Sequence, residues 1–334
     1  MTLLEPQAQR APRQWIRRYG MLLVLLAMMV LASFLSDRFL TSANLMNVTR
    51  QVAINAILAA GMTVVILSGG IDLSVGSVLA LTGAVGAGMM ASGGNWLVAV
   101  LAMLGLGTML GVVNGFFVAY GQLPPFIVTL AMMAFARGST LVYTNGRPIT
   151  VLNNSFQWFG HGQVGPVPAP VVIMIVLYVA FYVFLNRATL GRLIYAVGGN
   201  ERAARMSGVR VNFIKVLVYA VSGFTAGLAG IVMTSRLFSA QPTAGASYEL
   251  DAIAAVILGG TSLAGGRGSV TGTIIGAFII GILGNVLNLL NVSSFYQDVA
   301  KGVVILVAVL LDRLIHAGGK GAPRKGVAPR AEQA

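Results

Sequence analysis

The sequence predicts an all-α integral membrane protein with about ten transmembrane helices, and three observations predict it. Asp72 is the only acidic or basic side chain in the 86 residues between Arg50 and Arg137. A charge at the centre of a membrane-spanning helix costs about 2.5–3.5 kcal/mol, so such helices exclude charges that they do not use. Hydrophobic residues make up 57% of the 334 residues, charged residues only 9%, and the mean hydropathy is +0.84. The 42 glycines exceed the usual share of about 7%, and glycine lets helices approach closely in lipid.

Ten apolar segments divide the chain, and several of them are short or interrupted by glycine. They are Tyr19–Leu35, Val52–Leu67, Leu73–Met90, Trp96–Tyr120, Phe126–Tyr143, Val171–Leu185, Val216–Ser235, Leu250–Leu263, Val270–Leu290 and Val299–Leu311. We predict one span at each, because a span needs about 20 predominantly apolar residues. The expected domain is a single transmembrane unit over residues 19–314, between basic tails at residues 1–18 and 315–334.

The basic residues predict the orientation, because cytoplasmic loops carry an excess of Lys and Arg. Four arginines precede the first span, which places the N-terminus in the cytoplasm. Counting forward, the basic loop 187–215 and the C-terminal tail are also cytoplasmic, and with Arg267 this side holds 16 of the 22 basic residues. Loop 144–170 is then external. The N-terminal segment resembles a signal peptide, but no small-x-small cleavage site follows, so we interpret it as a retained span.

The span count also predicts an inverted repeat. Spans two to five and seven to ten would be four-helix units of opposite orientation, an arrangement typical of transporters. The sequence GTMLG at residues 107–111 is echoed by GTIIG at residues 272–276. The alternative is chance similarity between two glycine-rich apolar segments.

Composition excludes several other classes of protein. The chain has no cysteine, and therefore no disulfide, thiol nucleophile or cysteine-ligated metal. His161 and His316 lie too far apart in sequence to indicate a histidine metal site, so we expect no bound metal. The net charge of +13 resembles that of a nucleic-acid-binding protein, but the basic residues gather at span ends and in the tails. There they indicate contact with anionic lipid rather than nucleic acid.

One polar motif, GGIDLSVG at residues 69–76, interrupts the apolar pattern between spans two and three. The paired glycines are typical of a helix end, and Asp72 or Ser74 can cap the next helix by accepting its free N–H groups. The alternative is that Asp72 lines a polar path and hydrogen-bonds a hydroxylated substrate. A catalytic role is not expected, since the motif lacks the nucleophile elbow and a nearby histidine.

A second motif, the basic stretch GRLIYAVGGNERAARMSGVRVNFIK at residues 191–215, predicts a short capped helix. Asn200 is a favoured N-cap, Glu201 and Arg205 suit the two ends of the helix dipole, and Gly208 suits the left-handed stop. About two turns of helix are too short to be stable alone in water, so we expect the segment to dock on a partner. A solvated loop is the alternative. The segment comprises Asn200, Glu201, Arg202, Ala203, Ala204, Arg205, Met206, Ser207 and Gly208.

The remaining signals concern helix contacts. Small residues at four-residue spacing predict packing ridges at Gly107, Gly111 and Gly115, and at Gly223 and Gly227. Three asparagines in apolar segments either hydrogen-bond between helices or line a pathway: Asn114, Asn285 and Asn288. The glycine-rich segment 259–268 lacks the G-K-[ST] ending of a phosphate loop, so no ATP site is expected.

From about Phe39 to Asp312 the sequence resembles the permease subunit of bacterial ATP-binding-cassette sugar importers of the ribose type. The resemblance rests on five ordered motifs. They are NAILAAGMTVVILSGGIDLSVGSVLALTGAV from Asn55, TLVYTNGRPI from Thr140, GRLIYAVGGNERAARMSGVRV from Gly191, SAQPTAGASYELDAIAAVILGGTSLAGGRGS from Ser239 and NLLNVSSFYQ from Asn288. Relatives of this type carry ribose, xylose, arabinose, galactose or autoinducer-like sugars.

The resemblance implies a multi-pass protein of the bacterial plasma (inner) membrane that works as a homodimer. It implies a cytoplasmic ATPase subunit, which holds ATP and Mg, and an external sugar-binding protein. This chain would bind no cofactor, and its segment 198–208 would couple to the ATPase while the path opens alternately to each side. An ion-coupled transporter that uses Asp72 is the alternative. A membrane-embedded enzyme is not expected, because the sequence shows no nucleophile–base pair.

Overall fold

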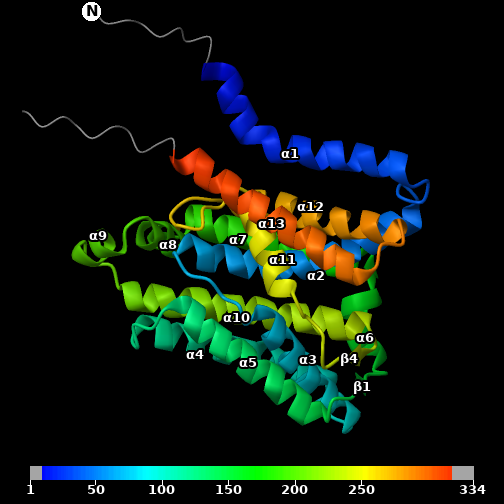
Figure 1. The fold of residues 1–334 in the computed structure, drawn as a ribbon. Helices are drawn as coiled ribbons and strands as arrows, with labels where there is room; N and C mark the ends of the chain where they lie inside the picture. The colour runs from blue at the N-terminus through cyan, green and yellow to red at the C-terminus, as the bar shows by residue number, and fades with distance from the viewer. Residues whose placement is uncertain (1–9, 318–334) are drawn as a thin grey trace, which may run out of the picture.

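The computed structural model describes residues 10–317, which form helices joined by short connections (Figure 1). The helices are α1 (Arg10–Leu35), α2 (Ser42–Leu67), α3 (Val75–Ala91), α4 (Trp96–Ala119), α5 (Pro125–Thr144), α6 (Asn154–His161), α7 (Ala169–Arg187), α8 (Thr189–Gly199), α9 (Glu201–Met206), α10 (Val211–Arg236), α11 (Tyr248–Leu258), α12 (Val270–Leu289) and α13 (Ser294–Ala317). The two-residue strands are β1 (Ile149–Thr150), β2 (Gln163–Val164), β3 (Val167–Pro168) and β4 (Ser239–Ala240).

Each of the ten predicted spans coincides with a helix, but not every helix is long enough to cross a membrane. By length and composition, six described helices are long and apolar enough to cross a membrane: α2, α4, α5, α7, α10 and α12. The apolar part of α1 and the whole of α3 are shorter. Helix α1 begins at Arg10, nine residues before the predicted span, so part of the predicted tail 1–18 is helical. The described residues exclude residues 1–9, half of the predicted N-terminal tail, and residues 318–334, most of the predicted C-terminal tail.

The eighth predicted span, Leu250–Leu263, is wrong in its extent. Helix α11 has 11 residues and ends at Leu258, so it rises about 16 Å, roughly half of the 30 Å hydrocarbon core. Gly260 adopts φ +82°, a left-handed conformation that stops the helix. The apolar residues after Leu258 belong to a glycine-rich connection rather than to helix.

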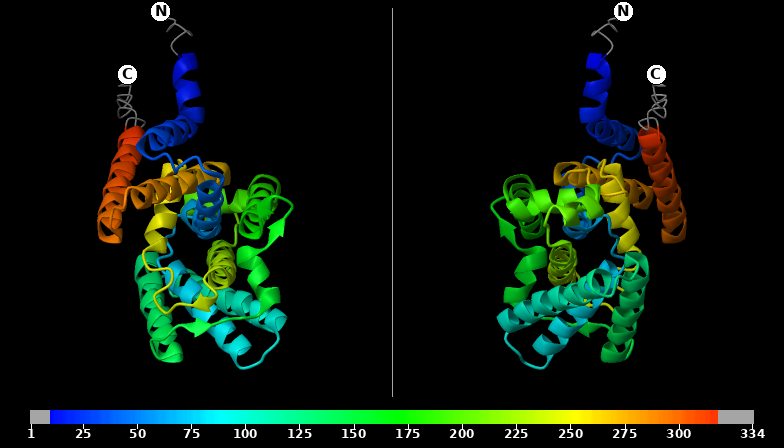
Figure 2. Two further views of the ribbon diagram at one scale, coloured as in Figure 1. Left: turned by 90° about the vertical axis from the view of Figure 1, so that its right-hand side faces the viewer. Right: turned by 90° about the vertical axis from the view of Figure 1, so that its left-hand side faces the viewer.

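Helices α2 and α10 form the centre of the bundle and pack against one another. Gly61 of α2 lies directly against Ser222 and Thr225 of α10, so a side chain there would collide with α10. Helix α2 is also covered by α7, α11 and α12, whereas α10 is covered by α3, α4 and α6 (Figure 2). Helix α2 accordingly carries the largest share of the fully buried apolar side chains.

The packing is pseudo-symmetric. The first helix of each predicted repeat, α2 or α10, packs on the second and third helices of the other repeat. Within the repeats, α3 contacts α4 and α5, and α11 contacts α12 and α13. The GTMLG echo is not part of this symmetry, because Gly107 and Gly111 face α10 while Gly272 and Gly276 face α11.

The predicted external loop 144–170 is structured, which its polar composition did not predict. Strands β1 and β4 pair antiparallel, as do β2 and β3. Helix α6 packs on the end of α10, where the Gly160 N–H donates to Ser235 Oγ at 2.7 Å and Ser235 donates to the Phe156 carbonyl at 2.9 Å. This cap lies at the end of the molecule opposite α8 and α9 (Figure 1).

Candidate coupling segment and transport site

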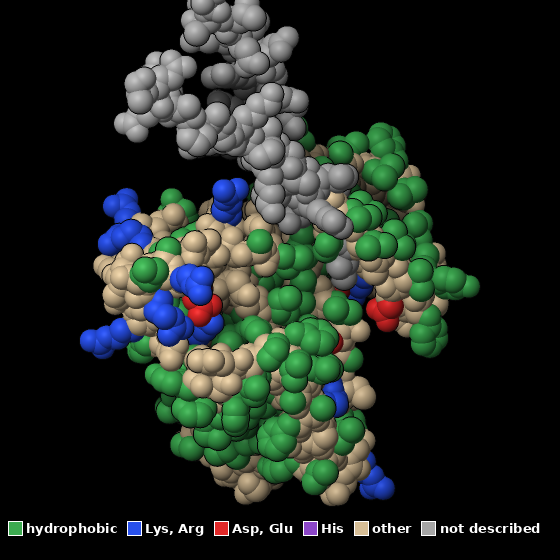
Figure 3. Space-filling model, turned by 60° about the vertical axis from the view of Figure 1, so that its left-hand side comes forward, with side chains coloured by type: hydrophobic (Ala, Val, Ile, Leu, Met, Phe, Trp, Pro, Cys, Tyr) green, Lys and Arg blue, Asp and Glu red, His purple; other side chains and the backbone are tan. Residues whose placement is uncertain are grey.

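The predicted short helix is present as α9, and local capping fixes its ends. Asn200 Oδ1 accepts the Ala203 N–H at 2.9 Å, and Ser207 and Gly208 follow the last turn, with Gly208 at φ +82°. The helix projects at one end of the molecule, where Figure 3 shows a group of Lys and Arg side chains. Arg202, Ala203 and Met206 are exposed there, Met206 by 85%.

The charges of α9 are partly satisfied within the chain. Glu201 pairs with Lys215 at 2.8 Å and with Arg205 at 3.2 Å. The hydrogen bond from Lys215 holds the pKa of the Glu201 carboxyl below its ordinary value, against the opposing effect of partial burial. Lys215 lies in the first turns of α10, so this pair ties the short helix to the central helix.

Ala204 is the one buried residue of the predicted docking segment 200–208. Ala203 is exposed, but Ala204 is 6% exposed and belongs to the main hydrophobic core. Its carbonyl accepts the Val209 N–H at 3.1 Å. Ala204 therefore anchors α9 to its own chain and leaves Ala203 on the outer face.

Three glycine-containing segments contact one another next to α9: the end of α2, the end of α8 and the α11–α12 connection. The Gly266 N–H donates to the Leu67 carbonyl at the end of α2 at 2.9 Å. Gly198, at the end of α8, packs against both Leu67 and Gly266 with no room for a side chain. Tyr195 donates to the Gly268 carbonyl at 3.0 Å. The segment that leads into α9 is thus in direct contact with α2 and with the α11–α12 connection.

Asp72 is the centre of a buried hydrogen-bond network. Its Oδ1 accepts the Ser74 N–H at 3.0 Å and the Ser74 hydroxyl at 2.6 Å, and its Oδ2 accepts the Ser222 hydroxyl at 2.8 Å. Asn114 of α4 donates to Ser74 Oγ at 3.0 Å. Asp72, Ser74 and Asn114 are each 1% exposed. The network joins the α2–α3 connection to α4 and α10.

The expected cap of α3 is absent. Ser74 occupies the N-cap position but makes no side-chain cap hydrogen bond; its hydroxyl donates to Asp72 and accepts from Asn114 instead. The N–H that Asp72 accepts belongs to Ser74 itself, which precedes the first helical residue. The carboxylate therefore braces the connection rather than the free N–H groups of α3.

Helices α3 and α11 both begin inside the bundle, and their starts meet. Gly76 in the first turn of α3 lies against the Gly245 backbone and the Glu249 carboxylate. Arg137 of α5 holds the chain before α11, since Nη1 donates to the Pro242 carbonyl at 2.9 Å and the Ala244 carbonyl at 2.8 Å. Broken helices with convergent N-termini are typical of transporter sites.

The other predicted site residues are interhelical contacts. Asn285 and Asn44 exchange two hydrogen bonds, at 2.9 and 3.1 Å, which join α12 to α2. Gly107, Gly111 and Gly115 of α4 lie against the α10 backbone, including Gly223 and, for Gly107, Gly227. Asn288 accepts from Gln297 at 2.8 Å and is exposed.

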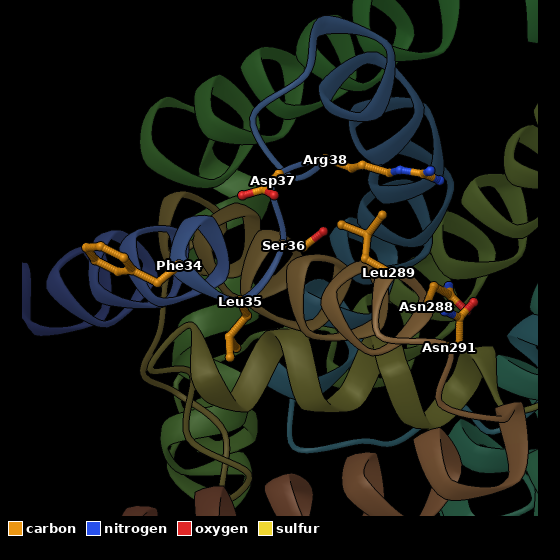
Figure 4. Close-up of a pocket in the computed structure, with 8 residues that line it drawn as sticks. All are labelled: Phe34, Leu35, Ser36, Asp37, Arg38, Asn288, Leu289 and Asn291. Carbon is orange, nitrogen blue, oxygen red and sulfur yellow. The ribbon is translucent and has the colours of Figure 1, made fainter.

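Asn288 also lines an open cavity of about 590 Å³ between the α1–α2 connection and the end of α12. Figure 4 shows its lining, which comprises Phe34, Leu35, Ser36, Asp37, Arg38, Asn288, Leu289 and Asn291. The cavity is thus formed at the ends of helices and not between their central turns.

Sequence reasoning missed two sets of charged residues inside apolar helices. Arg137 served only to mark the end of the charge-free stretch, yet it lies within α5. Asp251 of α11 and Lys301 of α13 pair at 2.9 Å, with side chains 8% and 22% exposed. The available signal was the position of these charges in apolar segments, where retained charges are usually functional.

A family model described as the permease component of a branched-chain amino acid transport system matches residues 44–309. The chain belongs to this permease family. The permease is 54% identical to the ribose import permease protein of Escherichia coli (strain K12) over 304 residues, which is 90% of this chain and 95% of the relative. It is 53% identical to that of Bacillus subtilis (strain 168), over 89% of this chain and 93% of the relative.

A more distant relative is the D-allose transport system permease protein of Escherichia coli (strain K12), at 40% identity over 89% of this chain and 92% of that protein. No solved structure matches the permease. These findings confirm the resemblance and the prediction of a multi-pass plasma-membrane permease component that is not itself the ATPase.

Proposed function

We propose that this chain is the transmembrane permease subunit of an ATP-driven importer and forms the path for ribose. The observation that carries the proposal is the 54% identity to a ribose import permease over 90% of this chain. Identity to the D-allose permease is lower, at 40%. The proposal therefore selects ribose among monosaccharides.

The experiment that tests it is uptake of labelled ribose in cells that lack their own ribose uptake and express the complete importer. Uptake should persist after an uncoupler dissipates the ion gradient and should stop when ATP is depleted. Unlabelled ribose should compete for uptake better than allose or xylose. Uptake that follows the ion gradient, or that allose blocks at lower concentration than ribose, would overturn the proposal.

Ion coupling through Asp72 is less well supported. Both carboxylate oxygens already accept hydrogen bonds from side chains of the same chain, and the residue is 1% exposed. An ion carrier needs its carboxylate to meet water or a cation during each cycle. The observed bonds favour a bracing role.

We also propose the ten-span topology with both termini in the cytoplasm. The coincidence of each predicted span with a helix and the pseudo-symmetric packing support it. Because α11 is too short to cross alone, the turn-rich segment 237–247 before it would carry the chain to the middle of the bundle. Segment 68–74 before α3 would do the same from the opposite end.

The proposed assembly is a homodimer of this chain with two ATPase subunits, which hold ATP and Mg, and an external sugar-binding protein. The exposed basic end around α9 supports docking of the ATPase there. The contacts between Gly198, Leu67 and Gly266 offer a direct route from α9 to α2 and to the α11–α12 connection. Movement of α9 would thereby move α2 in the first predicted repeat and the α11–α12 connection in the second. The path would then open alternately to each side of the membrane.

A further inference from the structure

Polar side chains from three helices converge on a small cavity inside the bundle. The cavity has a volume of about 70 Å³ and lies between α2, α11, α12 and α13. Its polar lining comprises Gln51, Asn55, Tyr248, Asp251, Gln297 and Lys301. Gln51 and Asn55 follow the start of α2 by nine and 13 residues, which is about 14 and 20 Å along the helix. The cavity therefore lies at bilayer depth.

Several of these groups have hydrogen-bonding capacity that the chain itself does not use. Asn55 Oδ1 is buried without a hydrogen-bond partner. Asn55 makes no side-chain hydrogen bond among the described residues, and Gln51 is exposed although it lies on a helix that is otherwise largely buried. An unpaired buried polar atom destabilises the fold, so these residues are better explained by an occupant that pairs with them.

The chemistry of the lining identifies the class of occupant. The amides of Gln51 and Asn55 offer donors and acceptors, and the phenol ring of Tyr248 offers an apolar face with a hydroxyl. Asp251 and Lys301 pair with one another at 2.9 Å, so the lining carries no net charge. A neutral polyhydroxylated ligand fits this set, whereas an anion or a cation would need an unpaired countercharge.

We propose that this cavity, lined by α2, α11 and α13, is a binding station for a monosaccharide on the translocation path. The inference rests on the proposed import of ribose and adds the residues that contact the sugar. The amide groups of Gln51 and Asn55 hydrogen-bond the sugar hydroxyls, and Asp251 and Lys301 position one another at its edge.

The volume indicates which conformation the structure represents. A cavity of about 70 Å³ has room for about two water molecules, each of which occupies about 30 Å³ in the liquid. A sugar is larger, so the station is constricted here and must widen to admit it. Helix α13 lies at the edge of the bundle against α11 and α12, which makes it the wall that can move (Figures 1 and 2).

A purely structural role explains only part of the cavity. The Asp251–Lys301 pair by itself would join α13 to α11, and buried charges in a bundle are usually paired. That role gives no reason for Asn55 to keep a buried oxygen without a partner, or for Gln51 to be exposed at this depth. The two accounts therefore differ most at Asn55 and Gln51, where the tests are placed.

The first test uses single cysteines in the complete importer, because the chain has no cysteine of its own. Gln51→Cys is compared with Gly105→Cys, since Gly105 lies nine residues after the start of α4, is exposed, and has open space where a Cβ would lie. A small water-soluble thiol reagent should modify Gln51→Cys at least tenfold faster and block ribose uptake. Equal modification rates, or normal uptake by modified Gln51→Cys, would overturn the proposal.

The second test replaces Asn55 with an apolar residue of similar shape. Asn55→Leu breaks no hydrogen bond of the described chain, so a structural role predicts normal uptake. The binding-station proposal predicts a loss of ribose uptake of tenfold or more, while ATP hydrolysis stimulated by the sugar-binding protein persists. Normal uptake would overturn it. If Asn55→Leu does not accumulate in the membrane, the cysteine comparison decides.

Failure of this inference can be distinguished from failure of the proposed function. The unmodified importer is assayed in parallel for ATP-dependent ribose uptake. If that uptake is present and both variants behave as their controls, only the binding station is wrong. If that uptake is absent, the proposed function is wrong, and the binding station is then wrong as well because it has no sugar to bind.

Discussion

Replacement of Asp72 separates a bracing carboxylate from an ion carrier. In Asp72→Asn the amide oxygen can keep both bonds from Ser74, and the amide nitrogen can donate to Ser222, whose hydroxyl reverses to accept. In Asp72→Ala all three bonds are lost, and the Ser74 and Ser222 hydroxyls remain buried without their acceptor. The two variants should therefore differ strongly in stability.

The size of the difference follows from the hydrogen bonds. Each buried hydroxyl left unpaired costs about 1–3 kcal/mol, so Asp72→Ala should lose about 2–6 kcal/mol. Asp72→Asn turns three charge-assisted bonds into neutral ones but leaves no group unpaired, so it should lose less than Asp72→Ala. Ser222→Ala removes only the Oδ2 bond and leaves that carboxylate oxygen unpaired, so it serves as an intermediate control with an expected loss of about 1–3 kcal/mol.

The assay combines the amount of folded permease in the membrane, its thermal unfolding in detergent, and ribose uptake per folded molecule. Asp72→Asn should retain most of its uptake and unfold a few degrees earlier, whereas Asp72→Ala should accumulate poorly. Complete loss of uptake in both variants, with normal protein levels and unfolding temperatures, would refute the bracing role and indicate an ionised functional group.

Four further predictions follow from the site. Ala203→Glu should abolish transport-coupled ATP hydrolysis and co-purification of the ATPase without lowering permease levels. Ala204→Glu should instead lower permease levels, because only Ala203 is exposed. Normal coupling in Ala203→Glu would exclude docking of the ATPase on α9. Arg137→Leu leaves two loop carbonyls without their donor, at about 1–3 kcal/mol each, so its unfolding temperature should fall by several degrees, and an unchanged temperature would contradict the clamp. Arg202→Cys should react with an impermeant thiol reagent only in inside-out vesicles, and reaction in intact cells would contradict the ten-span topology. Because the pKa of Glu201 is lowered, its ion pairs stabilise α9 at neutral pH and are lost only as the pH falls through that lowered pKa. The rate of coupled ATP hydrolysis in the native protein should therefore not change across the ordinary range of glutamate pKa values. The rate in Glu201→Gln should be lower than that of the native protein at neutral pH.

The sequence predicted the positions of the helices and of helix ends that depend on neighbouring residues. Apolar length placed a helix at each of ten segments, and the capping pattern at Asn200 and Gly208 placed α9 to the residue. Caps depend on neighbours within a few positions, which a sequence displays directly. The limit was the end of α11, where the apolar run continued past Gly259 although the backbone had left the helix.

Contacts between distant residues could not be predicted from the sequence. Arg137 binds carbonyls more than 100 residues away, and Asp251 pairs with Lys301 at a separation of 50 residues. Every residue has a backbone carbonyl, so the sequence does not show which carbonyls an arginine will bind. Nothing in the sequence therefore identified segment 241–247 as the partner of Arg137. For the same reason Asp72 was expected to cap the following helix, α3, whereas one of its partners, Ser222, lies on α10.

Ribose transport by purified components tests the central claim most directly. The permease is reconstituted in liposomes with its ATPase subunit on one side and the sugar-binding protein on the other, without any ion gradient. We predict that labelled ribose accumulates inside only when ATP is hydrolysed, and that accumulation stops in the Ala203→Glu variant. Ribose accumulation that needs an imposed proton or sodium gradient and proceeds without ATP would contradict the account.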